Sequence, residues 1–207
     1  MTVRQRFRGA IAGVGSTSGV RVVVGRWDDT PLGPFADVMV ETATGHRVLV
    51  APRADVAELV QGTYVFDETR IEPVAVTDTG TGWRVSAPSL AVELDLGRRT
   101  PLGLLLRAVP RGLAESPAWC ALTDPVARVV LSGVRTRGTA GNDRREWYGA
   151  TDTRAVTAVR GSFDGVDLGF LAPVDPPCRF GFSSTPRRPS VTRVATTIES
   201  AEPVVRR

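Results

Sequence analysis

Two valine-rich stretches near the amino terminus decide the expected fold: RFRGAIAGVG at residues 6–15 and SGVRVVVGRW at residues 18–27. β-Branched residues favour strands, and the glycines and serines between the two stretches are typical of a turn. The pattern therefore predicts a β-hairpin with its turn at Ser16 and Thr17. The glycine-rich run GVGSTSG (13–19) is followed by a strand pattern rather than a helix, so it predicts a hairpin loop and not a phosphate-binding loop.

Further strand-like segments recur along the chain, separated by turn signals at intervals of about 8–12 residues, a spacing typical of antiparallel sandwiches and barrels. They lie at residues 35–52, 63–76, 82–96, 127–135, 146–151, 155–163, 178–182 and 190–199. Asp164 and Gly165 predict an additional hairpin turn. In FADVMVE (35–41) the alternation predicts one apolar face, with Asp37 and Glu41 pointing the other way.

Helical signals are concentrated in the middle of the chain, where a side chain able to cap a helix precedes a proline at residues 100–101, 116–117 and 124–125. Threonine, serine and aspartate accept hydrogen bonds from a helix start, and proline fits the first helical position. The first two pairs predict short helices, the first ending before Pro110, while the third is interpreted as the opening of the next strand. One more short helix is expected at residues 53–60, where apolar residues share a face.

These elements together predict a mainly β protein, formally of the α+β class: a curved antiparallel barrel or cone-like sheet with two or three short helices. A chain of 207 residues is long enough for one substantial core, so a single β-rich domain is expected over residues 1–199. The polar, proline-interrupted residues 200–207 predict a frayed tail.

The composition of 42% apolar and 23% charged residues is typical of a soluble globular protein. No apolar run approaches the roughly 20 residues that a bilayer-spanning helix needs, and the first residues lack the apolar stretch of a signal peptide. We therefore expect a cytoplasmic protein with no membrane partner. Cys120 and Cys178 are the only cysteines and leave open whether they pair; with a single histidine, they predict no metal site.

The chain contains no lysine, because all 26 of its strongly basic residues are arginines. Without lysine it can form no Schiff base with a carbonyl or with pyridoxal phosphate, and it can contain no P-loop. The sequence shows no other cofactor-binding signature, so no cofactor is expected.

The net charge of +4 is distributed unevenly, with an excess of arginines in residues 1–26 and 101–207 and an excess of acids in residues 27–100. Such asymmetry can accompany nucleic-acid binding. Here the arginines are scattered singly along strand-like segments, with no dense run and no interleaved aromatic residues, so nucleic acid is not the expected partner. The sequence leaves open whether the chain forms a homo-oligomer.

The first candidate catalytic residue is His46, the only histidine, which follows a turn and starts a strand-like segment. A histidine there can present its ring at a sheet edge or barrel mouth and act as a general base, with Asp37 or Glu41 orienting it. Glu146 is the second candidate for a catalytic role. The alternative interpretation makes His46 a turn residue without chemistry.

Candidate ligand-binding residues come from the segment NDRREWYGATD (142–152). If it is a strand, Arg144, Glu146 and Tyr148 share one face, and they could orient a small polar or anionic ligand. Trp83, on another strand-like segment, is expected to line the same pocket. The alternative is a salt-bridged surface face opposite a buried tryptophan.

The run SSTPRRPS (183–190) places Arg187 and Arg188 between two prolines and next to three hydroxyl residues. Arginine forks bind carboxylates and phosphates through paired hydrogen bonds, so an anion site is one interpretation. The prolines stiffen the turn and remove backbone N–H donors, which favours a rigid turn whose arginines face water.

The stretch PLGPFADVMVE (31–41) resembles the glycine–proline–aromatic strand of the acetoacetate decarboxylase-like superfamily. The resemblance implies a curved, cone-like antiparallel β structure around a ligand pocket. The decarboxylase works through a lysine Schiff base, which this chain cannot form, so the implied pocket must do something else or only bind. In addition, GHRVLVAPR (45–53), REWYGATD (145–152) and RFGFSSTPRRPSV (179–191) resemble an uncharacterised protein family of GC-rich bacteria, which implies no activity.

Three functional hypotheses follow from these observations. The first is a protein that binds a small anionic or amphipathic metabolite in a β-barrel-like pocket, with arginines and aromatic residues at its mouth. The second is a lysine-independent acid–base enzyme, lyase- or hydrolase-like, that uses His46 with Glu41, Glu146 or Tyr148. The third is an interaction module with basic edge strands. The sequence leaves open which ligand is bound and whether the protein is an enzyme.

Overall fold

The computed structural model describes residues 2–130, 133–139 and 144–201. The helices are α1 Ala54–Gln61, α2 Pro101–Ala108, α3 Arg111–Ala114 and α4 Pro117–Val130. The strands are β1 Val3–Ser16, β2 Arg21–Asp29, β3 Phe35–Glu41, β4 Arg47–Ala51, β5 Glu68–Ile71, β6 Ala75–Asp78, β7 Gly82–Ala87, β8 Leu90–Arg99, β9 Arg137–Thr139, β10 Arg145–Phe163, β11 Val166–Asp167, β12 Leu171–Ala172 and β13 Ser190–Ser200.

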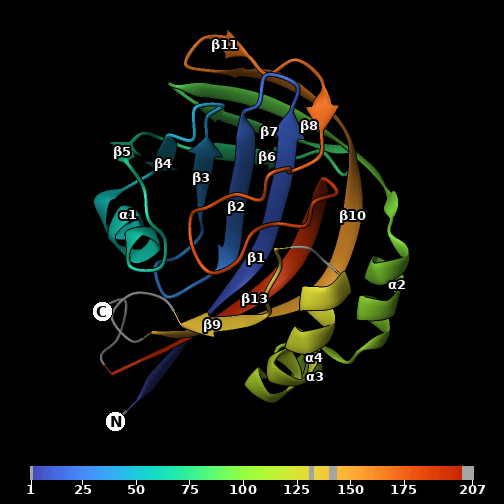
Figure 1. Cartoon of the computed structure of the whole chain (residues 1–207). Coiled ribbons are helices and arrows are strands. Elements are labelled where there is room, and N and C mark those ends of the chain that lie inside the picture. Colours follow the sequence, from blue (N-terminus) through green and yellow to red (C-terminus); the bar gives the residue numbers. More distant parts are fainter. Residues whose placement is uncertain (1, 131–132, 140–143, 202–207) are drawn as a thin grey trace.

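The strands form a 13-stranded sheet in the order β5-β4-β3-β2-β1-β13-β10-β8-β7-β6, with β9 and β11 paired to β10 and β12 paired to β1. Neighbouring strands are antiparallel except β4 and β5, which are parallel. The sheet curls without closing, so β5 and β6 are its edges, and the helices lie against its outside (Figure 1). The expected mainly β class with a curved sheet is confirmed.

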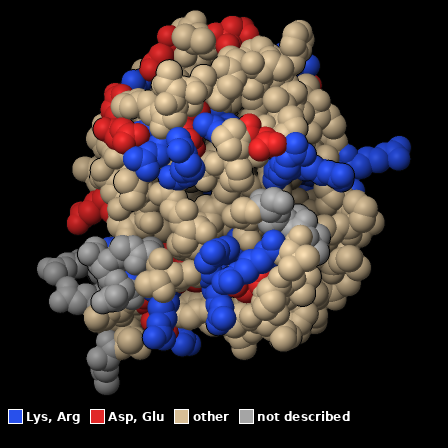
Figure 2. Space-filling model, viewed as in Figure 1, with Lys and Arg blue, Asp and Glu red and all other residues tan. Residues whose placement is uncertain are grey.

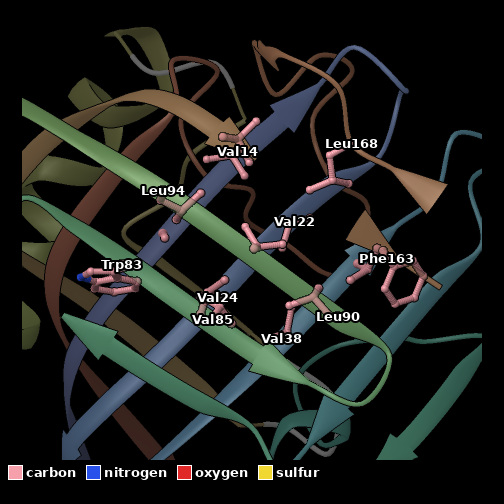
Figure 3. Packing of buried hydrophobic residues seen from close by; sticks show 14 of the residues in the cluster. Val14, Val22, Val24, Val38, Trp83, Val85, Leu90, Leu94, Phe163 and Leu168 are labelled. Carbon is pink, nitrogen blue, oxygen red and sulfur yellow. The ribbon is translucent and has the colours of Figure 1, made fainter. Parts of the chain in front are cut away.

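The inside of the curl is filled by an apolar core. Alternate residues of the first four strands point inward, where they meet side chains from β7, β8 and β10. Figure 3 shows these two groups facing each other: Val14, Val22, Val24 and Val38 on one side, Trp83, Val85, Leu90 and Leu94 on the other. Trp83 is thus part of this solid core.

The outer face of β1, β2 and β3 carries a second apolar core, which α1 and the segment of residues 174–180 cover. Val56, Leu59 and Val60 of α1 pack there, together with Cys178 and Phe180. As expected, Asp37 and Glu41 lie on the face of β3 opposite the inner core. Both faces of this strand are buried, however, so the two carboxyl groups are also buried.

The hairpins that the turn signals predicted are present. β1 and β2 pair antiparallel across a loop at residues 17–20, and the turn at Asp164 and Gly165 joins β10 to β11 with both residues at positive φ. Ser200 still pairs with Val3 in the sheet, and the expected tail beyond residue 201 lies outside the described residues.

The helices differ from the prediction in one important place. Thr100 and Ser116 cap α2 and α4 as expected, with Gly103 and Trp119 donating their backbone N–H groups. The pair at residues 124–125 opens no strand, because α4 continues through Pro125 to Val130. The predicted strand at 127–135 is therefore wrong.

Asp124 does not open a strand as expected but lies within α4. Its buried carboxylate accepts a hydrogen bond from the backbone N–H of Thr136 and forms an ion pair with Arg128 one turn later. It thus fixes the segment after α4 to the helix. Two further differences are the short helix α3, which was not expected, and residues 178–182, which form no strand.

None of the helices in the described part of the chain has the length and apolar character that a bilayer crossing requires. Both cysteines are buried free thiols, so the structure contains no bond between Cys120 and Cys178.

Candidate functional site

A cavity of about 340 Å³ lies on the outer face of the sheet, between the strands, the helices α2 and α4, and the segment of residues 178–186. Its lining is predominantly apolar, and it opens to solvent. The residues that line it include Ile11, Val23 and Met39 from the first strands, Leu102, Leu106, Trp119, Val126 and Ala127 from the helices, and Ala150, Thr153, Thr192 and Val194 from β10 and β13. The interior of the curled sheet, in contrast, is occupied by the first core.

Two glycines create space on this face of the sheet. A Cβ atom at Gly13 would collide with the side chain of Thr185, which closes one side of the cavity. A Cβ atom at Gly25 would collide with Asp37 and with the indole nitrogen of Trp27. The two glycines therefore allow polar side chains to cross strands that otherwise carry bulky residues.

A smaller cavity of about 60 Å³ adjoins the first and shares with it the side chains of Tyr64 and Tyr148. We call it the inner cavity. Its lining contains two buried carboxyl groups, those of Asp37 on β3 and Glu146 on β10, together with Thr63 and Thr196. The main cavity is thus lined mainly by apolar groups, and the inner cavity beside it supplies an acidic end.

The carboxyl group of Glu146 is held by two hydroxyl donors. The Thr63 hydroxyl donates to Oε1 and the Tyr148 hydroxyl to Oε2, both at 2.6 Å. The Tyr64 and Tyr148 hydroxyls are 2.7 Å apart. When Glu146 is ionised, Tyr148 gives its only proton to the carboxylate, so Tyr64 must donate to Tyr148. The three residues form a hydrogen-bonded chain from Glu146 to the wall of both cavities.

The end of α1 brings Thr63 and Tyr64 to this position. Both backbone N–H groups donate back to the carbonyl of Val60, which ends the helix and turns the chain toward β10. A Cβ atom at the intervening Gly62 would collide with the guanidinium of Arg144, so a glycine is needed there.

Burial is the main influence on the pKa values of the ionisable groups at this site. It raises the pKa of Glu146, although the hydrogen bonds from Thr63 and Tyr148 and the charge of Arg144 act in the opposite direction. Burial also raises the pKa of Tyr148 well above its ordinary value, with a further contribution from the Glu146 charge. The pKa of Tyr64 is raised for the same two reasons. The phenols therefore stay protonated and act as hydrogen-bond donors.

Asp37 is the second carboxyl group of the inner cavity. The indole N–H of Trp27 donates to its Oδ1 at 2.9 Å. Burial raises the pKa of Asp37 to about 7, and the hydrogen bond from Trp27 offsets only part of this effect. The group therefore changes its charge near neutral pH. Thr196, on the same cavity wall, has a buried hydroxyl oxygen without a hydrogen-bond partner in the described structure.

A buried ion cluster fixes the segment that covers the main cavity. Glu41 is fully buried and pairs with Arg21 at 3.1 Å, and it also accepts a hydrogen bond from the backbone N–H of Arg179 at 2.9 Å. Arg21 in turn donates to the carbonyl of Pro176. Cys178 lines the cavity beside this cluster, and burial, reinforced by the Glu41 charge, raises the pKa of its thiol to about 12. The thiol is therefore a structural group.

The structure brings only some of the predicted site residues together. Glu146 and Tyr148 meet at the inner cavity, and Arg144 lies close enough for its charge to act on Glu146. His46 lies at the surface, 46% exposed, with Nε2 3.1 Å from Oε2 of Glu68. Trp83 lies in the inner core of the sheet.

The two candidate anion-binding arginines face solvent. Arg187 forms an ion pair with Asp175 at 2.9 Å, and Arg188 is exposed. Neither of them lines the cavity, although Thr185 and Pro186 just before them do. The exposure of both arginines agrees with the interpretation of this segment as a turn whose arginines face water. Figure 2 shows the arginines of one face in separate groups, several beside acidic side chains, and not as a continuous stripe.

Sequence reasoning missed Tyr64, Thr63 and Trp27 as members of the site, and it considered Asp37 only as a partner of His46. One signal was present. Asp37 and Glu41 are acids within the otherwise apolar strand FADVMVE, and an acid in a strand that is buried on both faces must have a polar partner. Among the described residues, no group of three or more histidine, cysteine, aspartate or glutamate side chains is arranged to hold a metal ion.

Comparisons with known proteins give weak similarities. A structure of acetoacetate decarboxylase matches with a TM-score of 0.43 and 8% sequence identity, covering 94% of this chain and 84% of that one. A proposed AttH from Nitrosomonas europaea matches with a TM-score of 0.29 and 10% identity, covering 97% of this chain and 53% of that one. No family model and no curated protein matches the chain.

The structural similarity to acetoacetate decarboxylase is weak and shows no family, so the expected resemblance to its superfamily stays a prediction. The resemblance to a family of GC-rich bacteria stays a prediction.

Proposed function

We propose that the protein binds a small, largely apolar molecule in the main cavity, with the polar end of that molecule directed toward the inner cavity. The observation that supports this most is the cavity itself, about 340 Å³ of mainly apolar space beside a buried polar network. Ligand pockets typically combine an apolar wall of this size with a few polar groups that orient the ligand.

An amphipathic ligand agrees better with these surroundings than an anionic one. Among the described residues that line the main cavity, Arg135 is the only one with a positive charge, and the inner end carries two carboxyl groups. Arg187 and Arg188 point away from the cavity. An anionic head group would therefore meet like charges at the inner end.

The proposal is tested with 1-octanol as a neutral amphipathic probe in a thermal-shift titration and by calorimetry. Saturable binding with a rise in Tm is expected, since a ligand that binds only the folded state stabilises it. Ala150→Leu places a larger side chain in the cavity and should weaken octanol binding at least tenfold. Ala91→Leu, on an exposed position of β8, is the matched control. Absence of binding by the wild type, or equal binding by both variants, would count against the proposal.

A second candidate function is lysine-independent acid–base catalysis, with Glu146 in the role that the sequence suggested for His46. The hydrogen-bonded chain from Glu146 through Tyr148 to Tyr64 favours it, because such a chain can pass a proton between a buried carboxyl group and a ligand. The test is exchange of the acidic C–H protons of 2-octanone in D₂O, followed by NMR. Catalysed exchange that Glu146→Gln removes and His46→Gln does not would support it.

A further inference from the structure

We propose that the inner cavity binds a protonated primary amine, so that the molecule bound in the main cavity is an apolar amine. This inference rests on the proposed binding function and specifies the chemical class of the polar end. It starts from Asp37 and Glu146, two carboxyl groups that line the inner cavity from strands on different parts of the sheet. Within the described structure, no arginine or histidine lines this cavity.

The hydrogen-bonding groups of the inner cavity contain more acceptors than donors. Trp27, Thr63 and Tyr148 each use their proton on a carboxyl oxygen. Carboxylate oxygens accept more than one hydrogen bond, so Asp37 and Glu146 retain acceptor capacity. Among the described residues, the buried hydroxyl group of Thr196 has no hydrogen-bond partner, so its oxygen can accept from a ligand.

An ammonium group matches this arrangement. It carries three N–H donors and no acceptor, so it can satisfy two carboxylates and a hydroxyl oxygen together. A carboxylate or phosphate would bring only acceptors to a site that already has an excess of them. A neutral hydroxyl has a single donor and would leave most of these acceptors without a partner.

The space agrees with such a head group. A cavity of about 60 Å³ has room for a few groups the size of a water molecule, because one water needs about 10–15 Å³ of cavity volume. Tyr64 and Tyr148 belong to the walls of both cavities, so the proposal places the alkyl chain of the amine along this shared wall, toward the apolar main cavity.

The charges around the inner cavity also favour a cation. Burial raises the pKa of Asp37 and of Glu146, because an ionised carboxylate loses its hydration in an apolar interior. Arg144 compensates part of this at Glu146, while Tyr64 and Tyr148 remain neutral phenols. For Asp37, the hydrogen bond from Trp27 is the one influence among the described residues that lowers the pKa. A bound ammonium would supply the missing charge and lower both carboxyl pKa values.

The experiment compares three eight-carbon probes that differ only in the head group: octylamine, 1-octanol and octanoate. Calorimetry at pH 7.5 should give octylamine the highest affinity, at least tenfold above 1-octanol, and octanoate the lowest. The net charge of +4 repels a cation, so general electrostatics cannot produce this order. If 1-octanol or octanoate binds as tightly as octylamine, the inference is overturned while the binding function stands. If none of the three binds, both fail.

Two variants localise the amine. Asp37→Asn keeps an oxygen for the Trp27 N–H and removes the charge, and Glu146→Gln does the same beside Thr63. Each should weaken octylamine about ten- to a hundredfold, in line with the loss of a charged hydrogen bond, and leave 1-octanol unchanged. Glu93→Gln, an exposed acid of β8, is the control. Unchanged octylamine affinity in both cavity variants would overturn the inference.

Proton release gives an independent readout. Because the pKa of Asp37 is about 7, this group is partly protonated in the free protein at pH 7, and a bound cation would displace the proton. Calorimetry of octylamine in buffers of different ionisation enthalpy should show release of a fraction of a proton per molecule bound. The release should decrease in Asp37→Asn, where Glu146 is the only remaining carboxyl group among the described residues that line this cavity. Release of undiminished size in this variant would contradict the assignment to Asp37.

Discussion

The Tyr148 hydroxyl donates a 2.6 Å hydrogen bond to Oε2 of Glu146, two residues earlier on the same strand. Residues two apart on a strand point to the same face, so β10 alone places the phenol beside the carboxyl group. The end of α1 adds Tyr64 and Thr63 from a distant part of the sequence. These hydroxyl groups therefore link the segment after α1 to β10.

Tyr148→Phe should destabilise the protein by about 1–3 kcal/mol, because it leaves Oε2 of Glu146 and the Tyr64 hydroxyl without a partner in a buried site. The free energy of unfolding in urea measures this directly. Tyr64→Phe is the matched variant: it removes only the end of the chain and should cost about 1 kcal/mol. Equal effects of the two variants would show that the chain is not ordered as described.

Asp37→Asn should stabilise the folded protein above pH 7. Burial raises the pKa of Asp37 from its ordinary value of 3.8 to about 7. Above pH 7 the wild type therefore carries a buried carboxylate, which destabilises the folded state relative to the unfolded chain. As pH falls from 7 to 4, the native carboxyl group binds a proton before the unfolded chain does, and the wild type regains stability. The advantage of the variant, at most about 4 kcal/mol at about 1.4 kcal/mol per pKa unit, should disappear over this interval.

The measurement for Asp37→Asn is the difference in unfolding free energy between variant and wild type at pH 5, 6, 7 and 8. In this difference, the contributions of all other titrating groups to the unfolding free energy cancel, because variant and wild type share them. A constant difference across this range would mean that Asp37 does not titrate as its burial implies.

Glu41→Gln should destabilise the protein by about 3–5 kcal/mol, since it leaves the buried guanidinium of Arg21 without its carboxylate. Because this pair holds the segment that covers the cavity, the variant should also weaken octanol binding. Glu93→Gln breaks an exposed ion pair with Arg84 and should cost less than about 1 kcal/mol. Urea unfolding of both variants gives the comparison, and similar costs would contradict the role assigned to the buried pair.

Much of the strand pattern could be predicted because it depends on local signals. The alternation of valines and the Asp-Gly turn are properties of neighbouring residues, and both the first hairpin and the turn at residues 164–165 are present. The extent of α4 could not be read in the same way. Asp124-Pro125 is a good helix start, but here the pair lies inside a helix that Ser116 already starts, and Asp124 contacts Thr136.

The candidate site could be predicted only for those of its residues that lie on the same strand. Glu146 and Tyr148 were placed on one face by alternation alone, and the structure joins them. Tyr64 follows α1 and Asp37 lies on β3, and no local pattern relates these two positions to β10. Trp83 and His46 show the converse: both were candidates because of their residue types, but Trp83 lies in the inner core and His46 lies at the surface just before β4.

His46→Gln should change neither ligand binding nor stability by a measurable amount. The ring is 46% exposed, and its partner Glu68 is 40% exposed and also pairs with Arg70, so solvent screens the interaction and the carboxylate keeps a cation. The expected cost is below about 0.5 kcal/mol in urea unfolding, with octanol and octylamine affinities equal to those of the wild type. Tyr148→Phe in the same assays is the positive control. A tenfold loss of binding in His46→Gln would place the histidine in the site after all and contradict the assignment of the polar end to Asp37 and Glu146.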